Sequence, residues 1–165
     1  MSLVYVIEDD PMMADVIALA ARSTVLFDME GKEIHPDVKV FNDAVEPFSE
    51  MKTELPDVIL LDVLLSGPDG FTFLNELISY YDTAKIPVVL ISSIDMSQRN
   101  LEHYGVFHAL DKGTMTPEDI RDAVLLGLEK KMTAPELGVQ KLNQQLRQIA
   151  ANESSPTSDS EHNAV

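Results

Sequence analysis

Acidic side chains directly follow two of the most apolar runs in the sequence. Glu8, Asp9 and Asp10 follow the run Leu3 to Ile7, and Asp62 follows the run Val58 to Leu61. Carboxylates that converge at one edge of a sheet repel one another and have raised pKa values unless a cation compensates them. Mg²⁺ fits such a set, because it binds oxygen ligands and shares its coordination with phosphate oxygens.

Two further polar side chains stand at equivalent places. Ser92 follows the apolar run Val88 to Ile91, and Lys112 follows the run Phe107 to Leu110 after one intervening residue. Taken singly, Ser92 is explained as a turn hydroxyl, Lys112 as a surface charge and Asp10 as a helix cap. Taken together with the carboxylates, the ammonium and the hydroxyl offer partners for phosphoryl oxygens. The set therefore predicts phosphoryl chemistry, with Asp62 as a nucleophile that forms an acyl phosphate.

The elements that carry these residues alternate along the chain. Short apolar runs rich in β-branched residues predict buried parallel strands, and amphipathic patterns between them predict helices. The expected strands are 3–7, 38–41, 58–61, 88–91 and 107–110. Five helices are expected between and after them: one that begins at Pro11, one over about 46–54, one over about 70–81, one over about 96–104 and one that begins at Pro117. This alternation predicts a doubly wound α/β domain over residues 1–131, whose ligands bind beyond the carboxyl ends of the strands.

Three segments fall outside that repeat. Phe27 to Asp37 is long for a connector and is interpreted as a solvated loop, with a partner-binding insertion as the alternative. Residues 132–152 predict an amphipathic helix, because Val139, Leu142, Leu146 and Ile149 form a narrow apolar stripe. That helix packs on the domain or on a partner, and a self-associating seam is the alternative. Residues 153–165 lack apolar side chains to bury and are expected to be disordered.

The charge of the chain excludes some classes of function. The 165 residues carry 12 basic and 28 acidic side chains, a net charge of −16, which argues against binding a nucleic-acid backbone. Apolar runs are shorter than the ~20 residues of a membrane span, and no basic segment precedes the first run as in a signal peptide. The absence of cysteine fits a reducing cytosol. Most of the excess acidic residues are interpreted as surface charges that keep the protein soluble.

The sequence resembles the receiver domain of bacterial two-component response regulators over about residues 1–131. The motifs that carry the resemblance are Val6-Ile7-Glu8-Asp9-Asp10-Pro11, Pro56-Asp57-Val58-Ile59-Leu60-Leu61-Asp62, Pro68-Asp69-Gly70-Phe71, Ile86-Pro87-Val88-Val89-Leu90-Ile91-Ser92-Ser93 and Asp111-Lys112. The resemblance implies a flavodoxin-like, five-stranded parallel sheet of order 2-1-3-4-5 with helices on both faces. To this the chain adds the C-terminal helix.

The resemblance also implies the role of each site residue. Asp62 is the expected phosphoacceptor, with Ser92 and Lys112 beside the phosphoryl group. Glu8, Asp9, Asp62 and the backbone carbonyl of Leu64 are the expected Mg²⁺ ligands. A sensor histidine kinase or histidine phosphotransfer protein is the expected donor, and the output is an altered set of protein contacts. We then expect a cytoplasmic protein that catalyses only its own phosphorylation and dephosphorylation and is not otherwise an enzyme. It is expected to bind neither nucleic acid nor membrane, and a homodimer is possible.

Three residues depart from the pattern of the family. Ser66 and Gly113 stand where prolines are customary, the second commonly after a cis bond. Ala109 stands where an aromatic side chain usually changes rotamer on phosphorylation, and Phe107 is a candidate substitute on the same strand face, with a core position as the alternative. These departures motivate a second hypothesis, a constitutive adaptor that does not switch. A third, a magnesium-dependent phosphohydrolase, lacks a general acid at Leu64.

Overall fold

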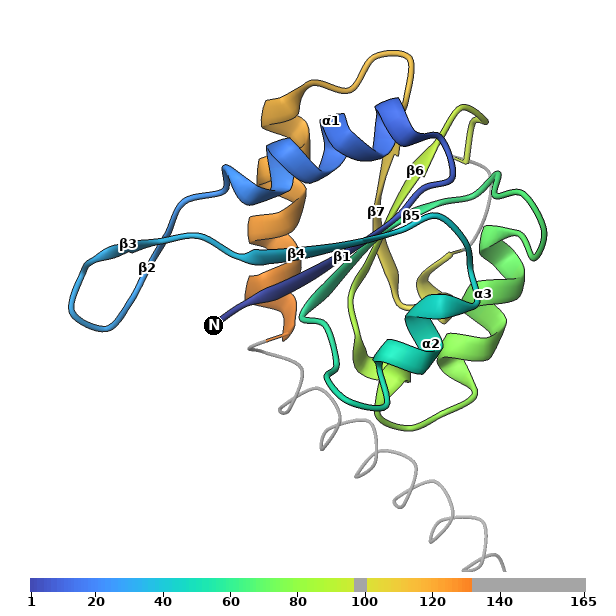
Figure 1. Ribbon diagram of the computed structural model, residues 1–165, viewed down its shortest axis with the longest axis horizontal. Coiled ribbons are helices and arrows are strands. Elements are labelled where there is room, and N and C mark those ends of the chain that lie inside the picture. Colours follow the sequence, from blue (N-terminus) through green and yellow to red (C-terminus); the bar gives the residue numbers. More distant parts are fainter. Residues whose placement is uncertain (97–100, 132–165) are drawn as a thin grey trace, which may run out of the picture. The chain divides into compact units, whose positions relative to one another are not determined.

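The computed structural model describes residues 1–96 and 101–131, which form a five-stranded parallel sheet between helices (Figure 1). The order of its strands is β4-β1-β5-β6-β7. Numbered along the chain within this sheet, the order is the expected 2-1-3-4-5. The strands are β1 (Leu3–Ile7), β4 (Asp37–Phe41), β5 (Val58–Asp62), β6 (Val88–Ser92) and β7 (Val106–Asp111).

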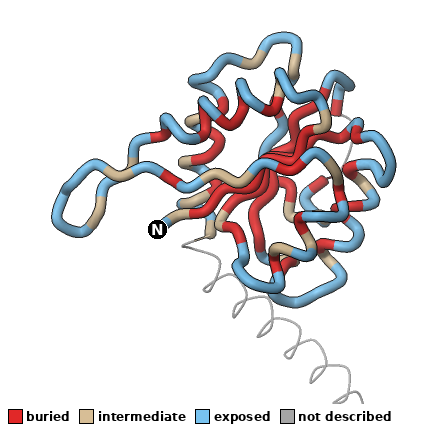
Figure 2. The backbone as a smooth tube through the Cα atoms, in the orientation of Figure 1, coloured by how far each residue is buried: buried red, intermediate tan, exposed pale blue. Residues whose placement is uncertain are grey.

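Burial separates the central strands from the edge strands. Every residue of β1, β5 and β6 is buried, so their continuous apolar sequences match positions covered on both faces (Figure 2). The edge strands β4 and β7 mix buried and exposed residues. The acidic side chains directly after β1, and Asp62 and Ser92 at the ends of β5 and β6, are therefore held by the most buried strands of the domain.

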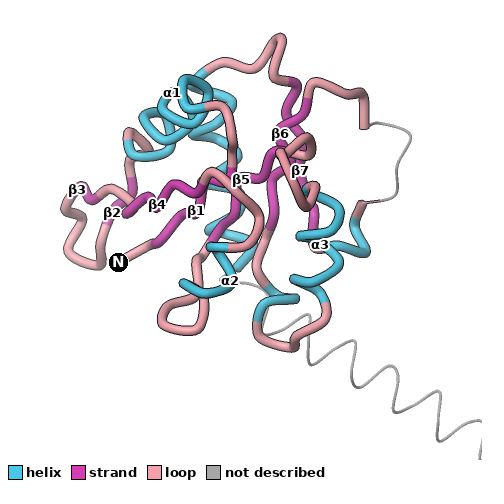
Figure 3. The backbone as a smooth tube through the Cα atoms, turned by 45° about the vertical axis from the view of Figure 1, so that its right-hand side comes forward, coloured by secondary structure: helices cyan, strands magenta, loops and turns pink. Residues whose placement is uncertain are grey.

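Helices cover both faces of the sheet. α1 (Pro11–Arg22) and the helix over residues 117–131 bury Ile17, Ile120 and Val124 in a core shared with the strands. On the other face, α3 (Gly70–Ile78) buries Phe73 and Leu74 in a second core, and α2 (Glu46–Glu50) lies nearby (Figure 3). Two short 3-10 helices, Thr83–Lys85 and Glu102–Tyr104, complete the described elements. Within residues 1–96 and 101–131, none of the helices is long and apolar enough to cross a membrane.

Some element boundaries differ from the expectations. α2 ends at Glu50 instead of Glu54, and α3 ends at Ile78 instead of Tyr81. Of the helix expected to span residues 96–104, residues 97–100 lie outside the described part, and Glu102–Tyr104 form a 3-10 turn. The helix predicted over 132–152 and the tail 153–165 also lie outside the described residues.

The connector after α1 is exposed over most of its length, as expected of a solvated segment, but it forms a β-hairpin instead of an irregular loop. β2 (Leu26–Phe27) pairs antiparallel with β3 (Glu33–Ile34). The Asp28 side chain fixes the turn by accepting hydrogen bonds from the amides of Glu30 (2.9 Å) and Lys32 (2.8 Å), and Gly31 has a positive φ of 77°. Strands of two residues are too short to give an alternating pattern, which explains why the sequence did not predict them.

Aspartates cap the two helices that begin beside the predicted site. Asp10 accepts a hydrogen bond from the amide of Met13 (2.8 Å) and caps α1, with Pro11 in the first turn. The interpretation of Asp10 as a helix cap is therefore confirmed. Asp69 caps α3 by accepting from the amide of Thr72 (2.8 Å) and from its hydroxyl (2.9 Å).

We expect Asp69→Ala to lower the free energy of unfolding by about 1 kcal/mol at neutral pH, because it removes this cap. Hydrogen bonds from the amide and hydroxyl of Thr72 lower the pKa of Asp69. The folded-state pKa lies below the unfolded one, so the contribution is present above about pH 4 and is lost as the pH falls through the folded pKa. Urea unfolding at pH 7 and pH 3 measures it. Asp69→Asn keeps a side-chain acceptor, so its free energy of unfolding should fall less than that of Asp69→Ala. An equal decrease in the two variants would contradict the capping explanation.

Candidate functional site

Three carboxylates meet at the carboxyl edge of the sheet. Glu8 and Asp9 follow β1, and Asp62 ends the neighbouring strand β5, which pairs Ile7 with Leu61 in parallel register. One oxygen of each of Glu8, Asp9 and Asp62 lies within 4.8 Å of the others. Glu8 is 1% and Asp62 2% exposed, whereas Asp9 is half-buried. The three acids thus offer hard oxygen donors around one point, as Mg²⁺ requires.

Lys112 joins two of these carboxylates. Its Nζ lies 2.7 Å from Oε2 of Glu8 and 2.9 Å from Oδ2 of Asp62, and its side chain is 14% exposed. The amide of Lys112 donates to the carbonyl of Ser92 (3.0 Å), which fixes the turn after β7 against the end of β6. The site therefore brings together a cation and two buried anions from three different strands.

Burial and ion pairing compete at this cluster. Burial raises the pKa of Glu8 more than the hydrogen bond from Lys112 lowers it. For Lys112, burial opposes the charged form, but the hydrogen bonds with Glu8 and Asp62 outweigh it and raise the pKa. The lysine is therefore held as a cation and provides the positive charge next to Asp62.

Asp9 is tied to the loop after β5. Its Oδ2 accepts hydrogen bonds from the amide of Ser66 (2.8 Å) and from the Ser66 hydroxyl, which together lower its pKa. A proline at position 66 has no N–H and could not make the first of these bonds. Ser66, noted in the sequence only as a departure, is thus a site residue that the sequence analysis missed. The two residues are 57 positions apart, so no local pattern connects them.

Asp62 and Leu64 form a local turn. The amide of Leu64 donates to Oδ1 of Asp62 (3.0 Å), while Oδ2 of Asp62 faces Lys112. The side chain of Leu64 is exposed, so Leu64 contributes to the site through its backbone. The amide of Leu64 thus joins this turn to Asp62, and the role of the Leu64 carbonyl as a Mg²⁺ ligand stays a prediction.

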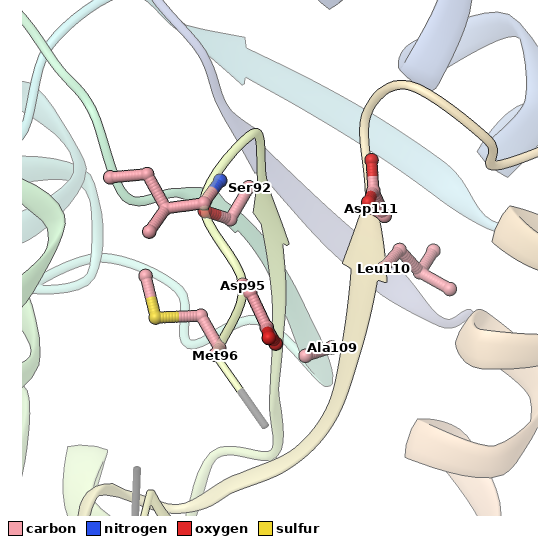
Figure 4. A pocket seen from close by; sticks show the side chains of 7 residues that line it. Ser92, Asp95, Met96, Ala109, Leu110 and Asp111 are labelled. Atoms are coloured by element: carbon pink, nitrogen blue, oxygen red, sulfur yellow. The ribbon is translucent and has the colours of Figure 1, made fainter. Parts of the chain in front are cut away.

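Ser92 lies at the edge of a hollow formed by the loop that follows β6 and the last residues of β7. The side chain is buried, and its Oγ accepts a hydrogen bond from the amide of Ile94 (2.9 Å). A cavity of about 280 Å³ opens beside it, and Ala109 contributes only a methyl group to its wall (Figure 4). The residues that line this cavity are Ser92, Ile94, Asp95, Met96, Ala109, Leu110 and Asp111.

Phe107 does not replace the missing aromatic side chain. A register shift in the pairing of β6 with β7 places Val88 opposite Val106 and Val89 opposite His108, so the strand has an irregularity at Phe107. Phe107 packs with the core under the helix 117–131, and a Cβ on Gly127 would meet its ring at 3.2 Å. The expectation that Phe107 shares a face with Ala109 was therefore wrong, because the bulge interrupts the alternation of side chains. The alternative, a core position, is confirmed.

Gly113 forms a compact turn after Lys112. Its amide donates to Oδ1 of Asp111 (2.6 Å), and the described residues contain no cis peptide bond. A proline at this position would lack that donor. Gly113 thus donates a backbone hydrogen bond in this turn that a proline, the customary residue of the family, could not donate.

Comparison with known proteins supports the same family. The response regulator receiver domain matches residues 4–125. A protein-glutamate methylesterase/protein-glutamine glutaminase of Rhodopseudomonas palustris is 36% identical over 83 residues, 48% of this chain and 21% of that protein. Response regulator PleD of Caulobacter vibrioides is 52% identical over 42 residues, 26% of this chain and 9% of that protein. The matched segments thus span about a fifth or less of these two relatives.

Solved structures share the fold. The receiver domain of a Francisella response regulator superposes with a TM-score of 0.63 at 21% identity, covering 79% of this chain and 98% of that one. A chemotaxis response regulator of Vibrio cholerae gives a TM-score of 0.62 at 18% identity, covering 78% and 99%. With its matching sequence, strand order and acidic cluster, the chain belongs to the response regulator receiver domain family.

Proposed function

We propose that Asp62 is the phosphoacceptor of this receiver domain. The observation that carries the proposal is the position of its carboxylate: buried at the end of a central strand, beside Glu8 and Asp9, and 2.9 Å from the ammonium of Lys112. A nucleophilic carboxylate needs positive charge nearby, because the transferred phosphoryl group brings negative charge to it. Lys112 supplies part of that charge.

The proposed donor is a phosphohistidine on a sensor histidine kinase or a histidine phosphotransfer protein. An oxygen of Asp62 forms the new O–P bond while the N–P bond of the donor breaks, and the electron pair of that bond leaves with the imidazole. Lys112 then pairs with a phosphoryl oxygen in place of Asp62, and the hydroxyl of Ser92 donates a hydrogen bond to another. Hydrolysis of the acyl phosphate by water restores Asp62.

Glu8, Asp9, Asp62 and the carbonyl of Leu64 would hold Mg²⁺. The donor set fits this ion, because Mg²⁺ prefers oxygen ligands. One oxygen of each of the three carboxylates lies within 4.8 Å of the others, and Leu64 is in the turn next to Asp62. When bound, the ion supplies positive charge to the phosphoryl oxygens. Ser66 holds the Asp9 carboxylate by its amide and hydroxyl and orients it before the ion arrives.

The output that we propose is an altered set of protein contacts made in the cytoplasm. The chain would catalyse only its own phosphorylation and dephosphorylation. The activities named for the curated relatives stay with those proteins, because the matches cover 21% and 9% of their lengths.

The proposal is tested by incubating the full chain with acetyl phosphate and Mg²⁺ and measuring its intact mass. Wild type should gain the mass of one phosphoryl group, and chelation of the metal should prevent the gain. Asp62→Asn keeps the size of the side chain but lacks the nucleophilic carboxylate, so it should gain nothing. Equal labelling of both proteins would refute the assignment.

The hollow at Ala109 favours a second candidate, an adaptor that binds its partner without switching. No aromatic ring from Phe107 fills the space beside Ser92, so the route from the phosphoryl group to β7 lacks that side chain. Amide chemical shifts of β7 with and without beryllium fluoride and Mg²⁺ distinguish the two. Shifts along Val106–Asp111 indicate a switch, whereas shifts confined to the turns around Asp9, Asp62 and Lys112 indicate the adaptor.

A further inference from the structure

Two of the three clustered carboxylates have a donor from the protein at each of their oxygens. In Glu8, Oε1 accepts from the amide of Asp10 (3.2 Å) and Oε2 lies 2.7 Å from the ammonium of Lys112. In Asp62, Oδ1 accepts from the amide of Leu64 (3.0 Å) and Oδ2 lies 2.9 Å from the same ammonium. The protein thus divides its donors evenly between the oxygens of these two side chains.

The carboxylate of Asp9 is held differently, because both donors of Ser66 go to one oxygen. The amide of Ser66 (2.8 Å) and its hydroxyl each donate to Oδ2 of Asp9. An ionised carboxylate has about four lone-pair positions, shared equally by its two oxygens. The two bonds from Ser66 therefore occupy Oδ2, and Oδ1 is the oxygen of Asp9 that Ser66 leaves to a cation.

The backbone of the loop after β5 sets the position of Ser66. The amide of Gly70 donates to the carbonyl of Val63 (3.0 Å), which closes the loop on itself, and Asp69 caps α3 at its end. Gly67 follows Ser66 with a positive φ of 97°, a conformation that turns the chain back at little cost for glycine. None of these features uses the side chain of Ser66. A substitution of that side chain should therefore leave the closure of the loop in place.

The two common divalent cations differ in how many carboxylate oxygens they take. Mg²⁺ binds about six ligands in near-octahedral geometry and keeps several waters, so one oxygen from a carboxylate is enough. Ca²⁺ binds about six to eight ligands at longer distances and often takes both oxygens of one carboxylate. A carboxylate with one oxygen already occupied by hydrogen bonds can offer a cation only the other oxygen. Such a ligand suits Mg²⁺ better than Ca²⁺.

We propose that Ser66 is a specificity-determining residue of the cation site: by occupying Oδ2 of Asp9 it restricts this ligand to one oxygen and so favours Mg²⁺ over Ca²⁺. The inference rests on the proposed Mg²⁺ site and adds to it a positioning residue that selects the ion. Proline, the customary residue of the family at this place, would supply neither donor. Hydrogen bonds to a metal-binding side chain typically change the affinity of a site about 10–100-fold.

NMR titrations of the full chain with MgCl₂ and with CaCl₂, at fixed ionic strength and without a phosphoryl donor, test the proposal. Wild type should bind Mg²⁺ at least about tenfold more tightly than Ca²⁺. Ser66→Ala removes the hydroxyl but keeps the amide, so it should lower this ratio about threefold, and Ser66→Pro removes both donors and should lower it about tenfold. Ser66→Thr keeps both donors and should hold the ratio within about twofold of wild type.

Ser79→Ala is the matched control, because it removes an exposed hydroxyl that donates to the carbonyl of Asn75 (2.7 Å) at the end of α3. It should leave both affinities unchanged. The ratio of affinities separates selection from a purely structural role, since a loosened loop weakens the binding of both ions alike. Equal weakening of both ions in Ser66→Pro, or a wild type without preference for Mg²⁺, would overturn this inference and leave the cation site of the proposed function standing. A wild type that binds neither ion would overturn both.

Discussion

Lys112→Met should lower the free energy of unfolding by about 3–5 kcal/mol at neutral pH in the absence of divalent metal. Methionine keeps most of the volume of the side chain but removes the ammonium that lies 2.7 Å from Glu8 and 2.9 Å from Asp62. The variant leaves two carboxylates that are 1% and 2% exposed without their cation. Removing one partner of a buried ion pair is costly for this reason, whereas an exposed pair contributes little.

Urea unfolding of wild type, Lys112→Met, Glu8→Gln and the double variant measures this coupling as a double-mutant cycle. Glu8→Gln in the Lys112→Met background should recover part of the loss, because it removes one of the two uncompensated charges. Added Mg²⁺ should stabilise Lys112→Met, because the ion would compensate the same carboxylates. A Lys112→Met protein as stable as wild type would contradict the electrostatic description of the site.

Gly70→Ala should lower the free energy of unfolding by about 2–3 kcal/mol, although alanine is the better helix former. A Cβ at Gly70 would lie 2.6 Å from the carbonyl oxygen of Asp62 and 2.8 Å from Cα of Val63. Both neighbours are backbone atoms at the end of β5, which cannot move aside as a flexible side chain can. The amide of Gly70 also donates to the carbonyl of Val63 (3.0 Å), so the start of α3 is pressed against the strand that presents Asp62.

Gly113→Ala is the matched control for that variant. Its Cβ would approach only Oδ1 of the Asp111 side chain, at 3.1 Å, and a carboxylate can rotate away. We expect a loss below about 1 kcal/mol. Urea unfolding midpoints at constant m-value compare the two. Similar losses in both variants would show that close approach to the backbone at Gly70 is not the cause.

The sheet was predictable from sequence because its three central strands are covered on both faces. Burial of that kind demands an unbroken apolar run, and the runs of β1, β5 and β6 are visible without a structure. The polar residues that end them identified Glu8, Asp9, Asp62 and Ser92, because the ends of parallel strands share one edge. Strand position thus determined most of the site.

Contacts between distant segments were not predictable in the same way. The bond from Ser66 to Asp9 depends on the path of the loop after β5, and the apparent defect at position 66 proved to be a hydrogen-bond donor. The bulge at Phe107 is a feature of the pairing between β6 and β7, which no alternating pattern in β7 alone reveals. The hairpin β2–β3 depends on turn chemistry at Asp28 and Gly31 with only two residues in each strand.

The most direct test of the central claim locates the phosphoryl group on the chain. After reaction with acetyl phosphate and Mg²⁺, borohydride reduces an acyl phosphate to the corresponding alcohol, which converts a phosphorylated aspartate to homoserine. Peptide sequencing by mass spectrometry then identifies the converted residue. The account predicts homoserine at position 62 and at no other aspartate. Conversion at Asp9 or another acidic residue, or a protein that remains unlabelled, would contradict it.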